Sequence, residues 1–240
     1  MQDGLYVALS AQVALERRLN TIADNVANAS TIGFRATGMK FEDVVSGLGQ
    51  KSVSFASSGD TFMSTATGAL RETGNPFDFA IQGDAWFGIE TPGGTVMTRD
   101  GRFSMLDTGD LVTLQGFPVL DAGGAPIQLD PQNGPPTSGA DGALRQQGQL
   151  VGALGLYNFD PGANFVRYGN SGIVPMGAPE PVVDRNDIGV AQGFLEESNV
   201  NPMLEITRLI SVQRAFENIA ASIRSTDQTL GDAISTLGSK

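Results

Sequence analysis

The sequence predicts an α+β protein in which long N- and C-terminal helices pair as a coiled coil and a β-rich middle domain separates them along the chain. Apolar residues recur in alternating steps of three and four near both ends, and short alternating apolar runs fill the middle. The first pattern is typical of a coiled-coil seam. The 31 glycines and 12 prolines among 240 residues favour a turn-rich β domain over disorder.

The C-terminal segment carries the clearer apolar stripe. Asn201 and Pro202 predict its start, since asparagine caps helices and proline is favoured at the first helical position. No neighbouring segment can bury this stripe, so its partner comes from far along the chain or from another molecule. Gln213 and Arg214 lie at its edge, where Arg214 is either solvated or fixes register against a neighbouring helix. The heptad positions are Leu209, Val212, Phe216, Ile219, Ile223, Thr226, Leu230, Ala233 and Leu237, widened by Ile206, Ile210 and Ile234.

The N-terminal segment offers such a partner, as a helix from about Gly4 to Ala29. Asn28 to Gly33 mixes capping and turn-forming residues, which predicts the end of this helix. Two ordinary amphipathic helices that cover a sheet would show a similar stripe, and this alternative stays open. The positions that share the heptad spacing are Leu5, Ala8, Gln12, Leu15, Leu19, Ile22, Val26 and Ala29.

The chain therefore divides into four predicted parts. They are an N-terminal helix over residues 1–33, an extended connecting segment over 34–75, a β-rich domain over 76–193 and a C-terminal helix over 194–240. Alternating apolar residues predict strands at 77–82, 85–90, 95–99, 103–106, 111–113, 118–120, 154–159 and 165–168. Residues 131–149 are rich in Gly, Pro and Asp and predict a surface loop or hairpin tips, and residues 169–193 look irregular.

Composition excludes several classes of function. The net charge of −11 argues against nucleic-acid binding and against docking on anionic lipid, both of which need basic patches. The chain has no Cys and no His, which excludes thiol nucleophiles, disulfides, zinc sites and His-based acid–base catalysis. No segment is long and apolar enough to predict membrane insertion, and no cleavable signal peptide is visible. We assign no catalytic, cofactor-binding or metal-binding residues.

A secreted carbohydrate-binding or carbohydrate-active β protein is the alternative from a different class. It would need a cleft of carboxylates or exposed aromatic side chains. Trp86 and Phe87 could line such a cleft, although the alternation makes at least one of them a core residue. No spacing selects two carboxylates from the candidates, which are Glu90, Asp100, Asp110 and Asp184.

Three stretches together resemble the bacterial flagellar rod and hook proteins. The N-terminal signature Asn-Val/Leu-Ala-Asn-x-x-Thr-x-Gly-Phe is matched at Asn25, Val26, Ala27, Asn28, Thr31, Gly33 and Phe34. The C-terminal signature is similar to Glu197 to Asn201, Glu205 and Gln213 to Phe216. Asn75 to Phe87 and Thr98 to Phe103 resemble the central region of rod proteins. Residues 131–189 carry no signature that we can match.

The resemblance implies a structural subunit of the axial rod in the periplasm, not an enzyme, with terminal helices inside the rod and the β-rich domain outside. Its partners would be other rod proteins, copies of itself and the flagellar type III export apparatus, which exports such subunits without signal cleavage. The length and the opening residues are most like those of proximal-rod members, with distal-rod members as the alternative. The expected assembly residues are Leu15, Leu19, Ile22, Asn25, Val26, Asn28, Gly33, Phe34, Leu209, Val212, Gln213, Arg214, Phe216, Ile219, Ile223, Leu230 and Leu237.

Overall fold

The computed structural model describes the chain except for residues 1, 42, 47–52, 57–58, 183–186 and 239–240. It divides into two compact units. The helix unit contains Met1–Ala27, Thr37–Phe62 and Asn201–Lys240, and the β-rich unit contains Asn28–Ala36 and Met63–Val200. Within the described residues, no helix combines the length and the apolar character that a membrane span requires.

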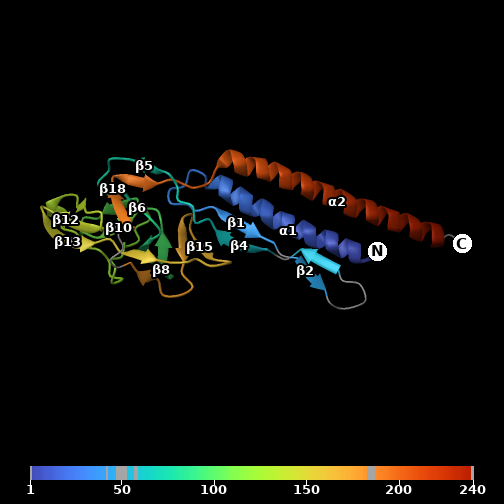
Figure 1. Ribbon diagram of the computed structural model, residues 1–240, viewed down its shortest axis with the longest axis horizontal. Coiled ribbons are helices and arrows are strands. Elements are labelled where there is room, and N and C mark those ends of the chain that lie inside the picture. The colour runs from blue at the N-terminus through green and yellow to red at the C-terminus, as the bar shows by residue number, and fades with distance from the viewer. Residues whose placement is uncertain (1, 42, 47–52, 57–58, 183–186, 239–240) are drawn as a thin grey trace. The chain divides into compact units, whose positions relative to one another are not determined.

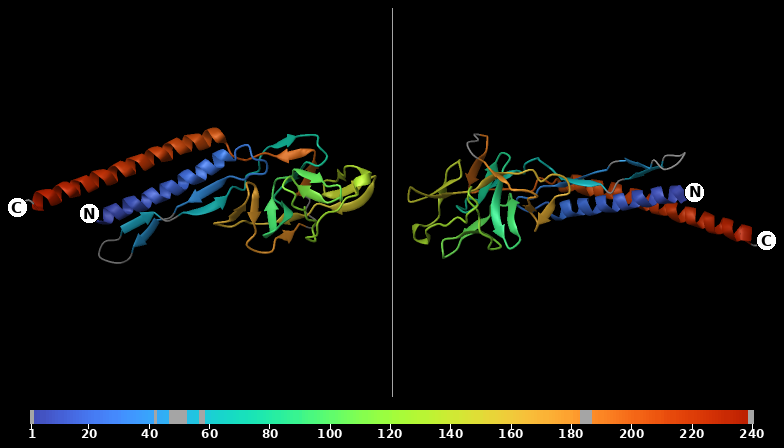
Figure 2. Two further views of the ribbon diagram at one scale, coloured as in Figure 1. Left: turned by 180° about the vertical axis from the view of Figure 1, so that it is seen from behind. Right: turned by 90° about the horizontal axis from the view of Figure 1, so that it is seen from below.

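Two long helices, α1 (Gln2–Ala27) and α2 (Pro202–Gly238), dominate the helix unit. They lie side by side and run in opposite directions, with both chain termini at the same end (Figures 1 and 2). The side chain of Asn201 accepts a hydrogen bond from the backbone N–H of Leu204 at 3.1 Å, which caps α2 as the sequence predicts. The mixed α+β class with a helix at each end is confirmed, and coiled-coil geometry of the pair stays a prediction.

Short strands complete the helix unit. Strand β1 (Thr37–Lys40) pairs with β4 (Asp60–Met63), whose last residue belongs to the β-rich unit. Strand β2 (Asp43–Ser46) pairs antiparallel with β3 (Val53–Ala56). The segment that follows α1 is thus largely extended and folds back along itself.

A six-stranded sheet organises the β-rich unit, with strand order β15–β16–β8–β7–β14–β17. The unit also contains a three-stranded sheet (β11–β12–β13) and the pairs β10–β9, β18–β6 and β19–β5. The strands are β5 (Leu70–Glu72), β6 (Phe79–Gln82), β7 (Trp86–Thr91), β8 (Gly94–Thr98), β9 (Phe103–Met105), β10 (Leu111–Thr113), β11 (Thr137–Ser138), β12 (Ala143–Gln146), β13 (Gln149–Ala153), β14 (Leu156–Asn158), β15 (Val166–Tyr168), β16 (Gly172–Val174), β17 (Glu180–Pro181), β18 (Gly189–Gln192) and β19 (Phe194–Glu196).

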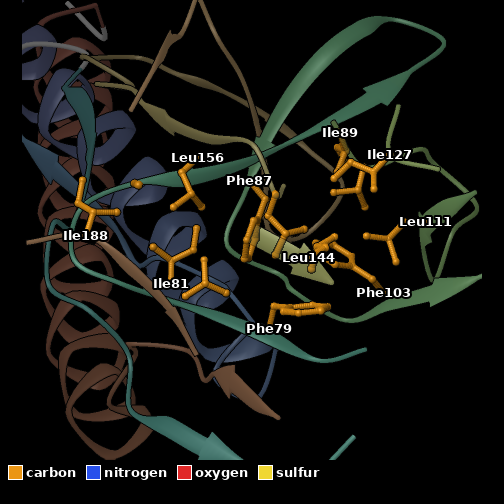
Figure 3. Close-up of a cluster of buried hydrophobic side chains, with 14 of the residues drawn as sticks. Phe79, Ile81, Phe87, Ile89, Phe103, Leu111, Ile127, Leu144, Leu156 and Ile188 are labelled. Atoms are coloured by element: carbon orange, nitrogen blue, oxygen red, sulfur yellow. The ribbon is translucent and has the colours of Figure 1, made fainter. Parts of the chain in front are cut away.

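The core of the β-rich unit is a cluster of apolar side chains from many of these strands. Phe79, Phe87 and Phe103 lie at its centre, where Phe87 and Phe103 meet edge to face with ring centroids 5.3 Å apart (Figure 3). Because neighbouring strand residues face opposite sides, Trp86 enters a second cluster with Met97, Tyr157 and Ile173. Both clusters are built mainly from segments that the sequence predicts to be strands.

Two stretches of the β-rich unit are more regular than predicted. Residues 131–149 contain a short 3-10 helix (Pro131–Asn133), β11 and β12, where only a loop or hairpin tips were expected. Residues 169–193, expected to be irregular, contain β16, β17 and β18. These strands are two to four residues long, so each is too short to show alternation in the sequence.

Candidate assembly site

The predicted heptad residues lie on α1 and α2, and most of those whose side chains are described are buried or half-buried. Ile22 on α1 and Val212 on α2 are buried within the helix unit. The other predicted residues of the seam are half-buried, namely Leu15, Leu19, Val26, Leu209, Phe216, Ile219 and Ile223. Gln213 and Arg214 are exposed, and Gln213 donates to Glu217 of the same helix at 3.2 Å. Leu230 and Leu237 lie on α2, but their side chains fall outside the described residues.

Asn25 belongs to the predicted set and has a local role in the helix unit. Its buried side-chain amide donates to the backbone oxygen of Thr37 and accepts from the backbone N–H of Thr37, both at 2.9 Å. The side chain therefore pairs with the first residue of β1 as a neighbouring strand would. Asn25 thus holds the returning chain against α1.

Two exposed apolar rows, one near the start of each helix, were not assigned as separate features from the sequence. Tyr6, Leu9 and Val13 on α1 follow steps of three and four, and so do Met203, Ile206 and Ile210 on α2. These six side chains are between 40% and 74% exposed. We call them the outer rows. The available sequence signal was the apolar character of Leu5 to Leu9 on more than one side of the helix, together with the widening of the C-terminal stripe at Ile206 and Ile210.

The helix unit also contains a groove of about 230 Å³ along α1, β1 and the start of α2. Asn25, Gly38 and Phe62 line it together with Arg18 and Arg208. The ring of Phe62 lies against Gly38, since a Cβ atom on this glycine would lie only 2.3 Å from the ring. Arg208 is half-exposed and pairs with the buried carboxylate of Glu205. The groove thus combines a flat apolar contact with guanidinium groups.

Gly33 and Phe34 are buried inside the β-rich unit. The N–H of Gly33 donates to the backbone oxygen of Glu196 at 2.8 Å. The guanidinium carbon of Arg167 lies 4.3 Å from the centroid of the Phe34 ring, a cation–π contact. Asn28, also in this unit, accepts from the side chain of Thr31 at 3.0 Å in the turn after α1. In the structure these predicted assembly residues therefore contribute to the folding of the subunit itself.

Replacement of Gly33 by alanine should lower the free energy of unfolding of the β-rich unit by about 3 kcal/mol or more. Gly33 has φ +69°, and an added Cβ would lie 2.3 Å from the backbone nitrogen of Asp100. Gly74→Ala is the matched control, because Gly74 has the same φ of +69° and open space around the Cβ position. It should cost about 1 kcal/mol. Urea unfolding followed by the fluorescence of Trp86 measures both, and equal losses would contradict the steric explanation.

Glu196 lies at the centre of a buried ion cluster in the β-rich unit. Its carboxylate accepts from Nη2 of Arg35 at 2.9 Å, from Nε of Arg99 at 2.7 Å and from the N–H of Gly68 at 3.0 Å. All three charged side chains are at most 4% exposed. The guanidinium carbons of both arginines lie 5.9 Å from the ring centroid of Trp86.

The guanidinium groups of both arginines also donate hydrogen bonds to backbone oxygens. Arg99 donates to the oxygens of Gly83 and Ala85, and Arg35 donates to those of Thr65 and Ala66. Burial lowers the pKa of the Arg99 guanidinium below its ordinary value, and the charge of Glu196 opposes this shift. Arginine stays protonated under such conditions, so the cluster holds two positive charges and one negative charge away from water.

The candidate side chains for carbohydrate binding or cleavage do not come together in one cleft among the described residues. Trp86 and Phe87 are both buried in apolar clusters. Asp100 is bound by Arg102 at 2.6 Å, and Asp110 accepts from Thr108 at 2.7 Å. Glu90 is exposed on β7, and Asp184 lies outside the described residues. Asp100 lines a pocket of about 110 Å³ with Phe117 and Tyr168, but no second carboxylate of the candidate set lines it among the described residues.

Family models match three parts of the chain. They are described as "Flagella basal body rod protein" for residues 5–35, "Flagellar hook protein FlgE/F/G D1 domain" for residues 80–145 and "Flagellar basal body rod FlgEFG protein C-terminal" for residues 191–236. The first and third contain most of the predicted seam. The second contains Trp86, Phe87 and Arg99.

Curated relatives match over nearly the whole chain. The flagellar basal-body rod protein FlgF of Mesorhizobium japonicum is 76% identical over 240 residues, which cover 100% of both chains. FlgF of Rhizobium meliloti is 57% identical and covers 99% of both chains. The flagellar basal-body rod protein FlgG of Bacillus subtilis is 30% identical and covers 98% of both chains. The chain belongs to the family of flagellar basal-body rod proteins.

Proposed function

We propose that this chain is a structural subunit of the proximal part of the flagellar basal-body rod and polymerises through its terminal helices. The observation that carries the proposal is the pair of exposed apolar rows that remain on α1 and α2 after the helices pack on each other. Exposed apolar rows of this kind mark protein–protein interfaces. The similarity to FlgF proteins along the whole chain supports the proximal position, and a distal-rod subunit like FlgG is the alternative.

The proposed assembly surface has two parts. The seam residues listed above hold α1 and α2 together as a coiled coil, which positions the helices for their neighbours. The outer rows and the exposed Gln213 and Arg214 then contact other subunits. Heterologous contacts of this type repeat along an axis and generate an open helical polymer, which is the geometry that a drive shaft requires.

The lengths of the helices support contact with neighbours near the chain termini. Helix α2 has 37 residues and α1 has 26, so α2 is longer by roughly 16 Å. Figures 1 and 2 show α2 continuing past the N-terminus of α1. The heptad positions Leu230 and Leu237 fall in the last third of α2. In the polymer, helices of neighbouring subunits would cover this part of the stripe.

Assembly is coupled to ordering of the helices. An isolated helix pair with uncovered apolar rows is only marginally stable in water, and neighbouring subunits supply the missing burial. The net charge of −11 opposes association of free subunits before export. We place the assembled subunit in the periplasmic rod, reached through the flagellar type III apparatus without signal cleavage. Its partners are other rod proteins and copies of itself, and it has no enzymatic activity.

Replacement of Phe216 or Ile219 by aspartate tests the proposal. Both residues are half-buried on α2, and a carboxylate there should abolish incorporation into the rod while the β-rich unit stays folded. Leu150→Asp is the control, because Leu150 is an apolar residue of β13 that is 62% exposed. Mass spectrometry of purified hook–basal bodies measures incorporation, and Trp86 fluorescence reports on the β-rich unit. Normal incorporation of both helix variants would overturn the proposed role of the helices.

A further inference from the structure

The ion cluster around Glu196 lies among the segments through which the chain passes between its two units. The chain changes unit after Ala27, Ala36, Phe62 and Val200. Three segments of the β-rich unit therefore continue into the helix unit, namely residues 28–36, the start of the segment from Met63, and the end of the segment at Val200. Any force that passes along the backbone between the units passes through these three segments.

All three segments are bound to one another within the β-rich unit. The N–H of Ser64 donates to the oxygen of Ala36 at 2.8 Å, which joins the first two segments. The Asn199 side chain accepts from the N–H of Ala36 and donates to the oxygen of Ala66, both at 2.7 Å. The third segment thus contacts both others through one asparagine side chain.

Charged hydrogen bonds from Arg35 and to Glu196 also join the three connecting segments. Arg35 of the first segment donates to Thr65 and Ala66 of the second and to Glu196 of the third. The carboxylate of Glu196 also accepts from the N–H of Gly68. Gly68 allows this close approach, since a Cβ atom there would lie 1.7 Å from the backbone oxygen of Glu197. Hydrogen bonds to ionised groups are roughly twice as strong as neutral ones.

Arg99 links the three connecting segments to the strands of the β-rich unit. Its Nε donates to Glu196, and its other nitrogens donate to Gly83 and Ala85, next to the strand that carries Trp86. A deeply buried cluster of two arginines and one carboxylate is weak evidence for added stability, because its desolvation is costly. Added stability alone therefore does not explain why charged side chains are buried there.

We propose that the Arg35–Glu196–Arg99 cluster is a clamp that holds the three connecting segments together and transmits mechanical load between the helix unit and the β-rich unit. The inference rests on the proposed role of the chain in a rotating rod. Glu196 is a positioning residue, because it acts through the segments that it holds. The inference also gives a single role to residues that lie in three separate family signatures or beside them: Arg35, Arg99 and Glu196.

Glu196→Gln tests the clamp with little change in volume. The glutamine amide keeps one acceptor and turns an N–H₂ donor toward the guanidinium groups, which weakens the cluster. Hydrogen exchange at the amides of Gly33 and Gly68 should become about 10-fold to 100-fold faster. The amide of Leu111, which donates to Ile127 in the core, should keep its wild-type rate. Glu197→Gln is the matched control, because its carboxylate pairs with Arg71 at 3.0 Å on the surface.

The same variants are then compared in motile cells. Cells with E196Q should carry wild-type amounts of the chain in hook–basal bodies and swim normally in dilute buffer. In a medium of high viscosity, where torque is greatest, they should swim more slowly than wild-type and E197Q cells. Equal exchange rates and equal viscous swimming in the two variants would overturn the clamp. A folded E196Q chain that is missing from the bodies would also overturn it, since Glu196 would then act in assembly.

A second variant decides the matter if E196Q does not fold. Asn199→Ala removes two hydrogen bonds of a half-buried side chain and leaves every charge in place. It should accelerate exchange at Gly33 and Gly68 and slow viscous swimming, and no change in either would overturn the inference. Absence of the wild-type chain from hook–basal bodies would instead refute the proposed function, whatever the exchange rates show.

Discussion

Arg99→Met should lower the free energy of unfolding of the β-rich unit by about 3–5 kcal/mol. Arg99 is about 1% exposed, and its guanidinium binds Glu196, Gly83 and Ala85. Methionine fills much of the same volume but donates no hydrogen bond. The substitution therefore leaves the backbone oxygens of Gly83 and Ala85, and one carboxylate oxygen of Glu196, without their donors. The remaining ion pair between Glu196 and Arg35 does not replace these hydrogen bonds.

Arg102→Met is the control for this result. Arg102 also pairs with a carboxylate, that of Asp100 at 2.6 Å, but its side chain is 34% exposed. Solvent compensates for the loss of such a pair, so the expected cost is below about 1 kcal/mol. The chain contains one tryptophan, Trp86, which lies beside Arg99 and reports on this unit in urea unfolding. Equal losses of unfolding free energy in Arg99→Met and Arg102→Met would show that burial of the cluster has no energetic consequence.

Joint replacement of Ile206 and Ile210 by aspartate should abolish incorporation into the rod without unfolding the subunit. Both side chains belong to the outer row of α2 and are at least 40% exposed in the subunit. Exposed substitutions usually change stability by less than about 0.5 kcal/mol each. In the assembled rod the same positions would be buried, and an unpaired carboxylate there would be strongly unfavourable.

Four measurements on this double variant separate assembly from folding. Circular dichroism should show wild-type helix content, and urea unfolding should show a wild-type midpoint for the β-rich unit. Hook–basal bodies should contain none of the variant, and the cells should not swim. Leu150→Asp, which places the same charge on an exposed apolar position of β13, should assemble normally. Motile cells with the double variant in their rods would show that the outer row of α2 does not contact other subunits.

Local signals in the sequence predicted much of the fold. The start of α2 at Pro202 follows from a cap and a proline at adjacent positions, and both signals lie within one turn. The two terminal helices were visible because apolar residues at steps of three and four mark one face of a helix. Strands such as β7 and β8 were visible because each has large apolar residues within a run of five or six positions and the turn formers Pro92 and Gly93 separate the two runs.

Features that depend on distant contacts were not predictable in the same way. Leu144 and Gln146 of β12 are buried, but Gln146 is polar and is satisfied by Asp130 and Gly134 in a separate loop. The bond between Arg99 and Glu196 joins residues 97 positions apart. Other carboxylates, such as Asp100, lie much closer to these arginines along the chain. Only the fold shows that Glu196 is the carboxylate buried between the two arginines. Pairing of this kind is decided by tertiary packing.

Quantitative mass spectrometry of detergent-purified hook–basal bodies from the source cells tests the central claim most directly. The account predicts that the chain is present in every preparation at a small, constant number of copies per body, as expected of a proximal-rod subunit. Dozens of copies would contradict the proximal position and move the chain to the distal rod. Complete absence would contradict its role as a rod subunit.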